Sequence, residues 1–312
     1  MLAKPIDTAL DTLVAPGFSR LGYAVRSRGW ADLPRLDGRT VAITGPTGGI
    51  GEAAAEGLAA LGASLILLVR NPEKGRALAA KLGGSPRVIE CDLSDLASVR
   101  AAAAQIDELH VLINNAGVMP DAYATSADGF ELTFATNVLG MFALTEALLP
   151  ALKASAPGRI ITVSSGGMYG QRLDVEAVQG TAKTGEDFSG VRAYARTKRA
   201  EVVLSDEWAR RLAGTGVSSY SMHPGWVNTP GLQQSLPGFA RLTGPVLRTP
   251  EQGADTIVWL AAAPEAEVPS GGFWHDRRTR PEHRMRKTHE APGDAARLYD
   301  LCTTLTTPTR ED

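Results

Sequence analysis

The sequence is poor in cysteine, and its two cysteines, Cys91 and Cys302, are too few for a disulfide framework. This scarcity is typical of a reducing compartment, so we expect a cytoplasmic location. No uninterrupted apolar run reaches the roughly 18 residues of a membrane-spanning helix, and we expect no signal peptide. The net charge of -2 gives no general reason to expect nucleic-acid binding.

Histidine is also scarce, with five residues in the chain. His283 and His289 lie close together but lack companion ligands at metal spacing, so we predict no metal site. What remains is ordinary: 312 residues, 44% hydrophobic and 21% charged, which is typical of a globular protein. This length suits one large α/β domain or two small ones.

Residues 1–35 precede the first strand and form a separate N-terminal arm. Leu10, Leu13, Val14 and Leu21 recur at helical spacing, followed by several arginines. Two interpretations stay open at this point. The segment could be an amphipathic helix that touches a membrane surface, or an arm that packs on the domain, since modest amphipathicity is common in soluble helices.

A glycine-rich turn follows the first strand. Thr40–Thr44 is short and apolar, Gly45, Gly49 and Gly51 come next, and an alanine-rich helix begins near Glu52. Glycines let the backbone approach a pyrophosphate, and the helix points its N-terminal N–H groups at the anion. This order of strand, turn and helix predicts a dinucleotide-binding loop.

The end of the second strand bears on cofactor choice. Ser64–Val69 ends at Arg70, where an acidic residue would bond the adenosine ribose of NAD. An arginine there accepts the 2′-phosphate of NADP instead. We therefore predict that NADP(H) is preferred over NAD(H).

The remaining pattern alternates strands with helices. We expect strands at 88–90, 110–113, 159–163, 217–222 and 272–274, and helices at 94–106 (with Ser94 as N-cap), 134–153, 193–213 and 252–263. Strands alternating with helices predict an α/β fold, a Rossmann-type doubly wound parallel sheet of about seven strands with helices on both faces. No change in composition suggests a second domain, so residues 36–278 form one.

Tyr194 and Lys198 lie four residues apart on an expected helix and therefore share one face. A phenol titrates near pH 10 and is a poor proton donor or acceptor at neutral pH. A neighbouring ammonium stabilises the phenolate and so lowers the pKa of the phenol toward neutral pH. The pair alone is a weak signal, because this spacing occurs by chance on many helices.

The ordered motifs over residues 36–278 resemble the short-chain dehydrogenase/reductase family. They are the Gly45 turn, Asn114-Asn115-Ala116-Gly117, Asn137, Ser165, Tyr194 with Lys198, and His223-Pro224-Gly225-Trp226. Several motifs are similar to the branch of dehydrogenase/reductase SDR family member 12 and the retinol dehydrogenase-like members. They are Val163–Met168, Thr229-Pro230, Pro237–Phe239 and Gln252–Thr256.

The resemblance implies a carbonyl–alcohol oxidoreductase with a bound nicotinamide cofactor. Tyr194 would be the general acid or base, Lys198 would support it and hold the nicotinamide ribose, and Ser165, with Ser164 as competitor, would bond the substrate oxygen. Asn137 would hold a water that links Lys198 to solvent. The implied cofactor-binding residues are Gly45, Thr47, Gly49, Ile50, Gly51, Arg70, Asp92, Asn115, Ala116, Gly117, Tyr194, Lys198, Pro224, Gly225, Val227 and Thr229. Asp92 could reach the adenine or cap a turn.

Three functions stay open. The first is an NADP(H)-dependent reductase or dehydrogenase for a small-molecule carbonyl compound or alcohol, and the resemblance to this branch suggests a bulky apolar one. The second is a non-catalytic NADP(H)-binding or sensing protein, since fold alone does not prove activity. The third is a sugar-nucleotide epimerase or dehydratase, which the spacing of Gly45, Gly49 and Gly51 disfavours. A homo-oligomer is compatible with the family, but nothing in the sequence fixes the number of subunits.

Two segments have no assigned role. Residues 171–192, between Ser165 and Tyr194, are longer than in many small members and either line the pocket or form a surface loop. Residues 279–312 contain a C-terminal helix near 295–305, preceded by a basic run, 277–287, for which we expect an exposed, solvated segment rather than a lipid-binding one.

Overall fold

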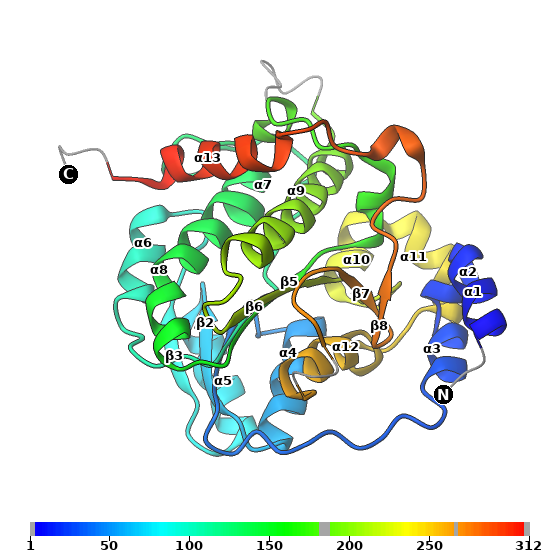
Figure 1. The fold of residues 1–312 in the computed structure, drawn as a ribbon, viewed down its shortest axis with the longest axis horizontal. Helices are drawn as coiled ribbons and strands as arrows, with labels where there is room; N and C mark the ends of the chain where they lie inside the picture. Colours follow the sequence, from blue (N-terminus) through cyan, green and yellow to red (C-terminus); the bar gives the residue numbers. More distant parts are fainter. Residues whose placement is uncertain (1–3, 181–187, 265–267, 309–312) are drawn as a thin grey trace.

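The computed structural model describes residues 4–180, 188–264 and 268–308. Its centre is an eight-stranded sheet in the order β3-β2-β1-β4-β5-β6-β7-β8, parallel except for β8 (Figure 1). The strands are β1 Thr40–Thr44, β2 Ser64–Val69, β3 Arg87–Glu90, β4 Val111–Asn114, β5 Gly158–Val163, β6 Val217–Met222, β7 Phe273–His275 and β8 Arg278–Arg280. The principal helices are α4 Gly49–Ala60, α5 Pro72–Leu82, α6 Leu96–Ala103, α7 Leu132–Phe134, α8 Met141–Ala154, α9 Gly190–Arg211, α10 Pro230–Ser235, α11 Pro237–Thr243, α12 Pro250–Ala262 and α13 Asp294–Thr306.

Helices cover both faces of the sheet, and each face has its own apolar core. One core joins the sheet to α6, α8, α9 and α13 through residues such as Leu148 and Trp208. The other joins it to α4, α5 and α12 through residues such as Leu58 and Ile257. Strands covered on both faces are apolar throughout, as in β2. Each fully buried leucine or isoleucine contributes about 1.5–3 kcal/mol to stability. This confirms the predicted α/β class and its two helical layers.

Several boundaries differ from the sequence-based expectation. The strand β8 was not predicted, because three residues of Arg-Thr-Arg carry no apolar alternation. Ser94 does not cap α6; the Asp95 side chain accepts from the backbone N–H groups of Ala97 and Ser98, at 2.9 and 3.2 Å. Its carboxylate is a stronger acceptor at this position than a hydroxyl.

The long helix expected at 134–153 is interrupted by a π-helical turn, Ala135–Gly140, between α7 and α8. By length and composition, the whole stretch Leu132–Ala154 could cross a membrane, although no uninterrupted run suggested it. In the structure, 78% of its most apolar window is buried inside the protein. It therefore serves as a core helix of the fold.

The N-terminal arm packs against the edge of the sheet formed by β7 and β8 (Figure 1). It consists of α1 Lys4–Thr12, α2 Val14–Phe18 and α3 Arg20–Arg26. The Phe18 carbonyl accepts hydrogen bonds from Trp226 N at 2.8 Å and Arg248 Nε at 3.0 Å. The Phe18 ring contacts Gly166 and stacks edge-on against His223. The arm thus supports two loops, one after β5 and one after β6.

A buried ionic cluster fastens this arm. Arg26 on α3 bonds Asp7 and Asp276, each at 2.8 Å. Arg248 donates to both oxygens of Asp276, at 2.6 and 2.8 Å, and Arg280 bonds Asp7. All five side chains are less than 10% exposed. We call these five residues the arm cluster.

The basic run 277–287 is not a solvated segment, which corrects our expectation. Arg280 is buried, Arg277 pairs with Asp255 at 2.7 Å, Arg278 with Asp7 at 2.9 Å, and Arg284 with Asp11 at 3.1 Å. The acidic partners lie outside the run, on α1 and α12, between 22 and 273 positions away, so the run looked uncompensated. Arg286 and Lys287 remain exposed.

A carboxyl pair joins this C-terminal segment to α9. Burial, reinforced by the negative charge of Glu282, raises the pKa of Asp206 to about 8. Since the ordinary value is 3.8, the stabilising contribution of the protonated form is complete below about pH 4 and is lost as the pH rises through about 8. We expect Asp206→Asn to raise Tm relative to wild type more at about pH 9 than at about pH 6. Equal differences at both pH values would show that the pair does not titrate in this way.

Candidate active site

Two adjoining clefts open at the edge of the sheet where the parallel strands end. The catalytic cleft, about 420 Å³, is lined by Ser165, Tyr194 and Lys198. The glycine-turn cleft, about 500 Å³, is lined by the turn after β1 and by Arg70. Both clefts share Ile50, Asn115, Gly117, Thr229 and Gly231 in their walls, so they meet there. Such a crevice is where doubly wound sheets bind dinucleotides.

The turn after β1 has a backbone that requires glycine. Gly45 has a φ of +62°, and a Cβ there would lie 3.0 Å from atoms of Ala116. Asn115 fixes the neighbouring loop, because its Nδ2 donates to the carbonyls of Thr44 and Gly45 at 2.9 and 3.2 Å. The turn then leads directly into α4, whose first N–H groups are available to an anion. This construction fits a dinucleotide pyrophosphate.

Two cations stand at the far end of the glycine-turn cleft. Arg70 ends β2, and Lys74 lies in the first turn of α5, which Asn71 caps through Glu73 N and Lys74 N. Both cationic side chains are exposed. Asp92, which lines the same cleft, caps a turn by accepting from Ser94 N at 2.9 Å and Ser94 Oγ at 2.7 Å. This end of the cleft therefore offers positive charge to a phosphate.

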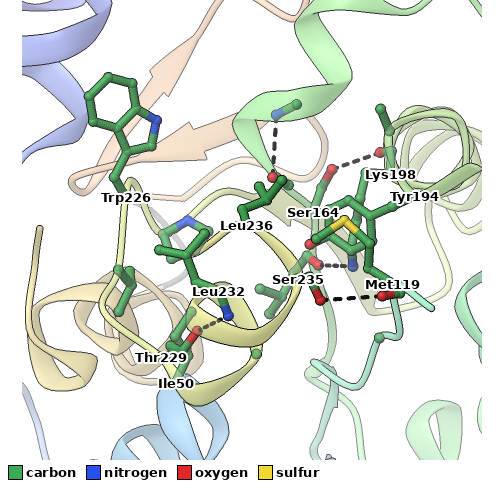
Figure 2. A pocket seen from close by; sticks show the side chains of 18 of the residues that line it. Ile50, Met119, Ser164, Tyr194, Lys198, Trp226, Thr229, Leu232, Ser235 and Leu236 are labelled. Carbon is green, nitrogen blue, oxygen red and sulfur yellow. Dashed lines mark hydrogen bonds between the residues drawn. The ribbon is translucent and has the colours of Figure 1, made fainter. Parts of the chain in front are cut away.

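Tyr194 and Lys198 lie on one face of α9, in the wall of the catalytic cleft (Figure 2). Lys198 Nζ lies 5.3 Å from the centroid of the Tyr194 ring. Nζ donates to the Val163 carbonyl at 2.9 Å and to Glu201 Oε1 at 2.8 Å. Burial pulls the pKa of Lys198 down, but the negative charges of Glu201 and of an ionised Tyr194 outweigh it and raise the pKa overall. Lys198 is therefore held as a buried ammonium.

The two candidate serines are used differently. Ser164 is buried, and its hydroxyl donates to the Lys198 main-chain carbonyl at 2.7 Å (Figure 2). Ser165 is half-buried at the cleft, where its Oγ accepts a long hydrogen bond of 3.3 Å from Gly167 N. Its hydroxyl proton stays free to donate to a ligand. Of the two, Ser165 has the hydroxyl better placed to bond a substrate oxygen.

Asn137 is fully buried within the π-helical turn and lines neither cleft. Its Oδ1 accepts from Val118 N at 2.8 Å, and its Nδ2 donates to Val118 O and Thr197 Oγ1. A Cβ on Gly117 would lie 3.1 Å from Lys198 Nζ and 3.5 Å from Asn137 Oδ1. Glycine at 117 thus lets the loop after β4 approach both side chains.

The outer wall of the catalytic cleft is apolar. Figure 2 shows Leu232, Leu236 and Trp226 on the side opposite Tyr194. Phe239, Met119 and Val191 complete this wall. Ser235 bridges the gap between α10 and the loop after β4 by donating to the Met119 carbonyl at 3.3 Å. A ligand held here would be surrounded mainly by hydrocarbon.

All the predicted cofactor-binding residues line one or both clefts. Sequence reasoning missed Lys74, the apolar wall of α10 and α11, and Glu201. Lys74 could have been found by counting cations one turn beyond Arg70. Of the segment 171–192, residues 181–187 lie outside the described part; Leu173, Val175 and Val178 pack in the core, whereas Val191 lines the cleft. Within the described ranges, no group of three or more His, Cys, Asp or Glu side chains could hold a metal ion.

Comparison with known proteins identifies the family to which this chain belongs. The family description "short chain dehydrogenase" matches residues 39–238. The chain is 38% identical to bovine (Bos taurus) dehydrogenase/reductase SDR family member 12 over 297 residues, which covers 91% of this chain and 92% of the relative. It is 40% identical to human (Homo sapiens) retinol dehydrogenase 11 over 255 residues, 78% of each chain.

A solved structure of an uncharacterized protein from Mycobacterium paratuberculosis superposes with a TM-score of 0.73 at 34% identity, covering 89% of this chain and 97% of that one. The match over more than half the chain, together with close relatives along most of its length, shows the family. The protein belongs to the short-chain dehydrogenase/reductase family and is an NAD(P)-dependent oxidoreductase of that family.

Proposed function

We propose that the protein interconverts an apolar carbonyl compound and its alcohol, with NADP(H) as cofactor and Tyr194 as general acid or base. The observation that carries this proposal is the position of Tyr194 and the Lys198 ammonium in the wall of the catalytic cleft, with Lys198 Nζ beside Gly117, which both clefts share. A dinucleotide along the glycine turn would end beside them. A purely binding protein has no need of a buried ammonium next to a tyrosine.

Each side chain has a defined task in this proposal. In reduction, the Tyr194 hydroxyl donates its proton to the carbonyl oxygen, and Lys198 stabilises the resulting phenolate. Ser165 donates a hydrogen bond to the same oxygen and fixes the orientation of the carbonyl. The third N–H of Lys198, left over from Val163 and Glu201, is available to the nicotinamide ribose. The nicotinamide supplies or accepts the hydride.

The apolar outer wall of the catalytic cleft supports this substrate class. Leu232, Leu236 and Phe239 offer hydrocarbon and no charge to the bound compound. Apolar surface removed from water contributes about 25 cal/mol per Å² to binding. The relatives named retinol dehydrogenase agree with a bulky apolar alcohol or aldehyde. We infer that affinity rises with the apolar area of the substrate.

The function is tested by following NADPH consumption by the purified protein. The panel contains a long-chain aldehyde, a retinoid aldehyde, a steroid ketone, a quinone and a short polar aldehyde. We expect turnover with the bulky apolar carbonyl compounds and a lower KM for them than for the short polar aldehyde. A lower KM for the short polar aldehyde would contradict the proposed substrate class.

Cofactor preference depends on Arg70 and Lys74. Charge-assisted hydrogen bonds contribute about 1.5–3 kcal/mol each, and about 1.4 kcal/mol is a tenfold change in Kd. The double variant Arg70→Ala, Lys74→Ala should therefore weaken NADPH binding by about 100-fold or more. NADH binding should change little, because NADH carries no 2′-phosphate.

Titration calorimetry with both cofactors measures this difference. Lys153→Ala, which removes an exposed cation at the end of α8, is the matched control and should bind both cofactors like wild type. Tighter binding of NADH than of NADPH by the wild-type protein would disprove the assignment.

A further inference from the structure

A buried acidic side chain, Glu201, lies on α9 one turn beyond Lys198. Glu201 is 2% exposed, and its Oε1 accepts the 2.8 Å hydrogen bond from Lys198 Nζ. Its other oxygen, Oε2, is buried and has no hydrogen-bond partner among the described residues. An unsatisfied buried carboxyl oxygen costs free energy, so a structural role alone is a poor explanation for it.

The Glu201 carboxylate lies where it can keep the buried Lys198 amine protonated. Burial of the Lys198 ammonium favours loss of its proton, and the carboxylate opposes that loss. Without a counter-charge, a fully buried lysine becomes neutral at a lower pH. A neutral Lys198 could not stabilise the phenolate of Tyr194.

Glu201 also fixes the direction of the ammonium. Two of its three N–H bonds point to Glu201 Oε1 and to the Val163 carbonyl at the end of β5. The third is left for the catalytic cleft, which Lys198 lines. Gly117 leaves room on that side, because its missing Cβ would lie 3.1 Å from Nζ.

We propose that Glu201 is a positioning residue for the reaction, whose carboxylate keeps Lys198 protonated and holds its Nζ toward the junction of the two clefts. This inference rests on the proposed function of Tyr194 and Lys198. The three residues lie four and three positions apart, along one face of α9. In this proposal, the substrate oxygen contacts Tyr194, Tyr194 lies beside Lys198, and Lys198 pairs with the buried carboxylate of Glu201.

Among the described residues, the groups whose charge acts on this pair are its own two members and Tyr194. Glu201 faces Lys198, and Lys198 faces Glu201 and Tyr194. Burial raises the pKa of Glu201, and the Lys198 ammonium lowers it again, to about 7. The carboxylate is therefore ionised on the alkaline side of neutrality, which is the range in which an unsupported lysine would lose its proton.

Glu201→Gln keeps the shape and an acceptor oxygen but removes the charge. For carbonyl reduction, we expect the alkaline limb of the pH profile of kcat/KM to move to lower pH by about 1–3 units, the usual effect of one neighbouring charge. Glu207→Gln, on the same helix but paired with Arg210 and Arg211, is the control and should leave the limb in place. An unmoved limb in Glu201→Gln, with activity lowered equally at every pH, would overturn the proposal.

Glu201→Asp decides the matter if the glutamine variant does not fold. It keeps the charge but lengthens the contact, so the limb should shift in the same direction by less. A folded aspartate variant that loses activity equally at every pH and leaves the limb in place would also overturn the proposal.

A second measurement needs no turnover, so it separates this inference from the proposed function. Infrared spectroscopy of the cofactor-free protein should show a protonated carboxyl band that titrates near pH 7 and disappears in Glu201→Gln. In Lys198→Met, the titration should move to higher pH, because the ammonium no longer favours the carboxylate. A band that titrates identically in Lys198→Met would show that the two groups are uncoupled and would overturn the proposal.

Discussion

Replacing Tyr194 by phenylalanine should lower kcat/KM for carbonyl reduction by about 10²–10⁴-fold, the usual contribution of a general acid. The variant removes one oxygen from the wall of the catalytic cleft and leaves the ring in place. NADPH binding should persist, since the glycine turn and Arg70 are untouched. Steady-state kinetics and cofactor titration together measure both quantities.

Tyr123→Phe is the matched control for this variant. Tyr123 is 37% exposed and packs edge-on against Phe188, outside both clefts. Tyr123→Phe should therefore keep the kcat/KM of wild type, because the reaction does not depend on the Tyr123 hydroxyl. If Tyr194→Phe kept most of its activity, the acid–base role would belong to another group, and the proposed mechanism would fall.

Asp276→Asn should destabilise the fold by about 3–5 kcal/mol, the cost of leaving buried charges unpaired. Asp276 carries the charge that Arg26 and Arg248 share, and its pKa is held well below the usual range by them and by His275, against the effect of burial. Asparagine keeps the size and tolerates the positive φ of +52° at this position. The decrease in the free energy of unfolding is therefore due to loss of the negative charge. Urea unfolding at neutral pH measures this decrease.

The pH dependence gives a second check on the arm cluster. A carboxyl with a depressed pKa stabilises the fold above its ordinary value of 3.8, and that contribution is lost as the pH falls below it. The difference between wild type and Asp276→Asn should therefore shrink in acid. Asp37→Asn, which breaks an exposed pair with Arg35, should change stability little at any pH. If Asp276→Asn and Asp37→Asn lowered the free energy of unfolding by similar amounts, burial of the arm cluster would not make its ion pairs more stabilising than an exposed pair.

The central sheet was predictable because its signals are local. Apolar runs bounded by turn residues mark β1, β2, β4 and β5, and the glycine turn marks the phosphate end of the clefts. Most of the motif residues that resemble the family line one of the two clefts, although Asn137 lines neither. These features need no knowledge of distant contacts.

Features that depend on pairing across the chain were not predictable. Arg26 meets Asp276, 250 positions away, and Arg280 meets Asp7, 273 positions away. In the sequence, each of these residues looks like a surface charge. Glu201 was missed for a related reason, because a glutamate three residues after a lysine on a helix is usually an exposed pair. Only the packing of α9 against β5 shows that it is buried.

The arm cluster also sets an order of events during synthesis. Arg26, the last residue of the arm's helices, leaves the ribosome 250 residues before Asp276, to which it binds. At about 5–20 residues per second, the arm waits roughly ten seconds to a minute for its partners. During that interval Phe18 has no pocket, and the loops after β5 and β6 have no support. Until its partners are made, the arm is therefore open to chaperones and proteases.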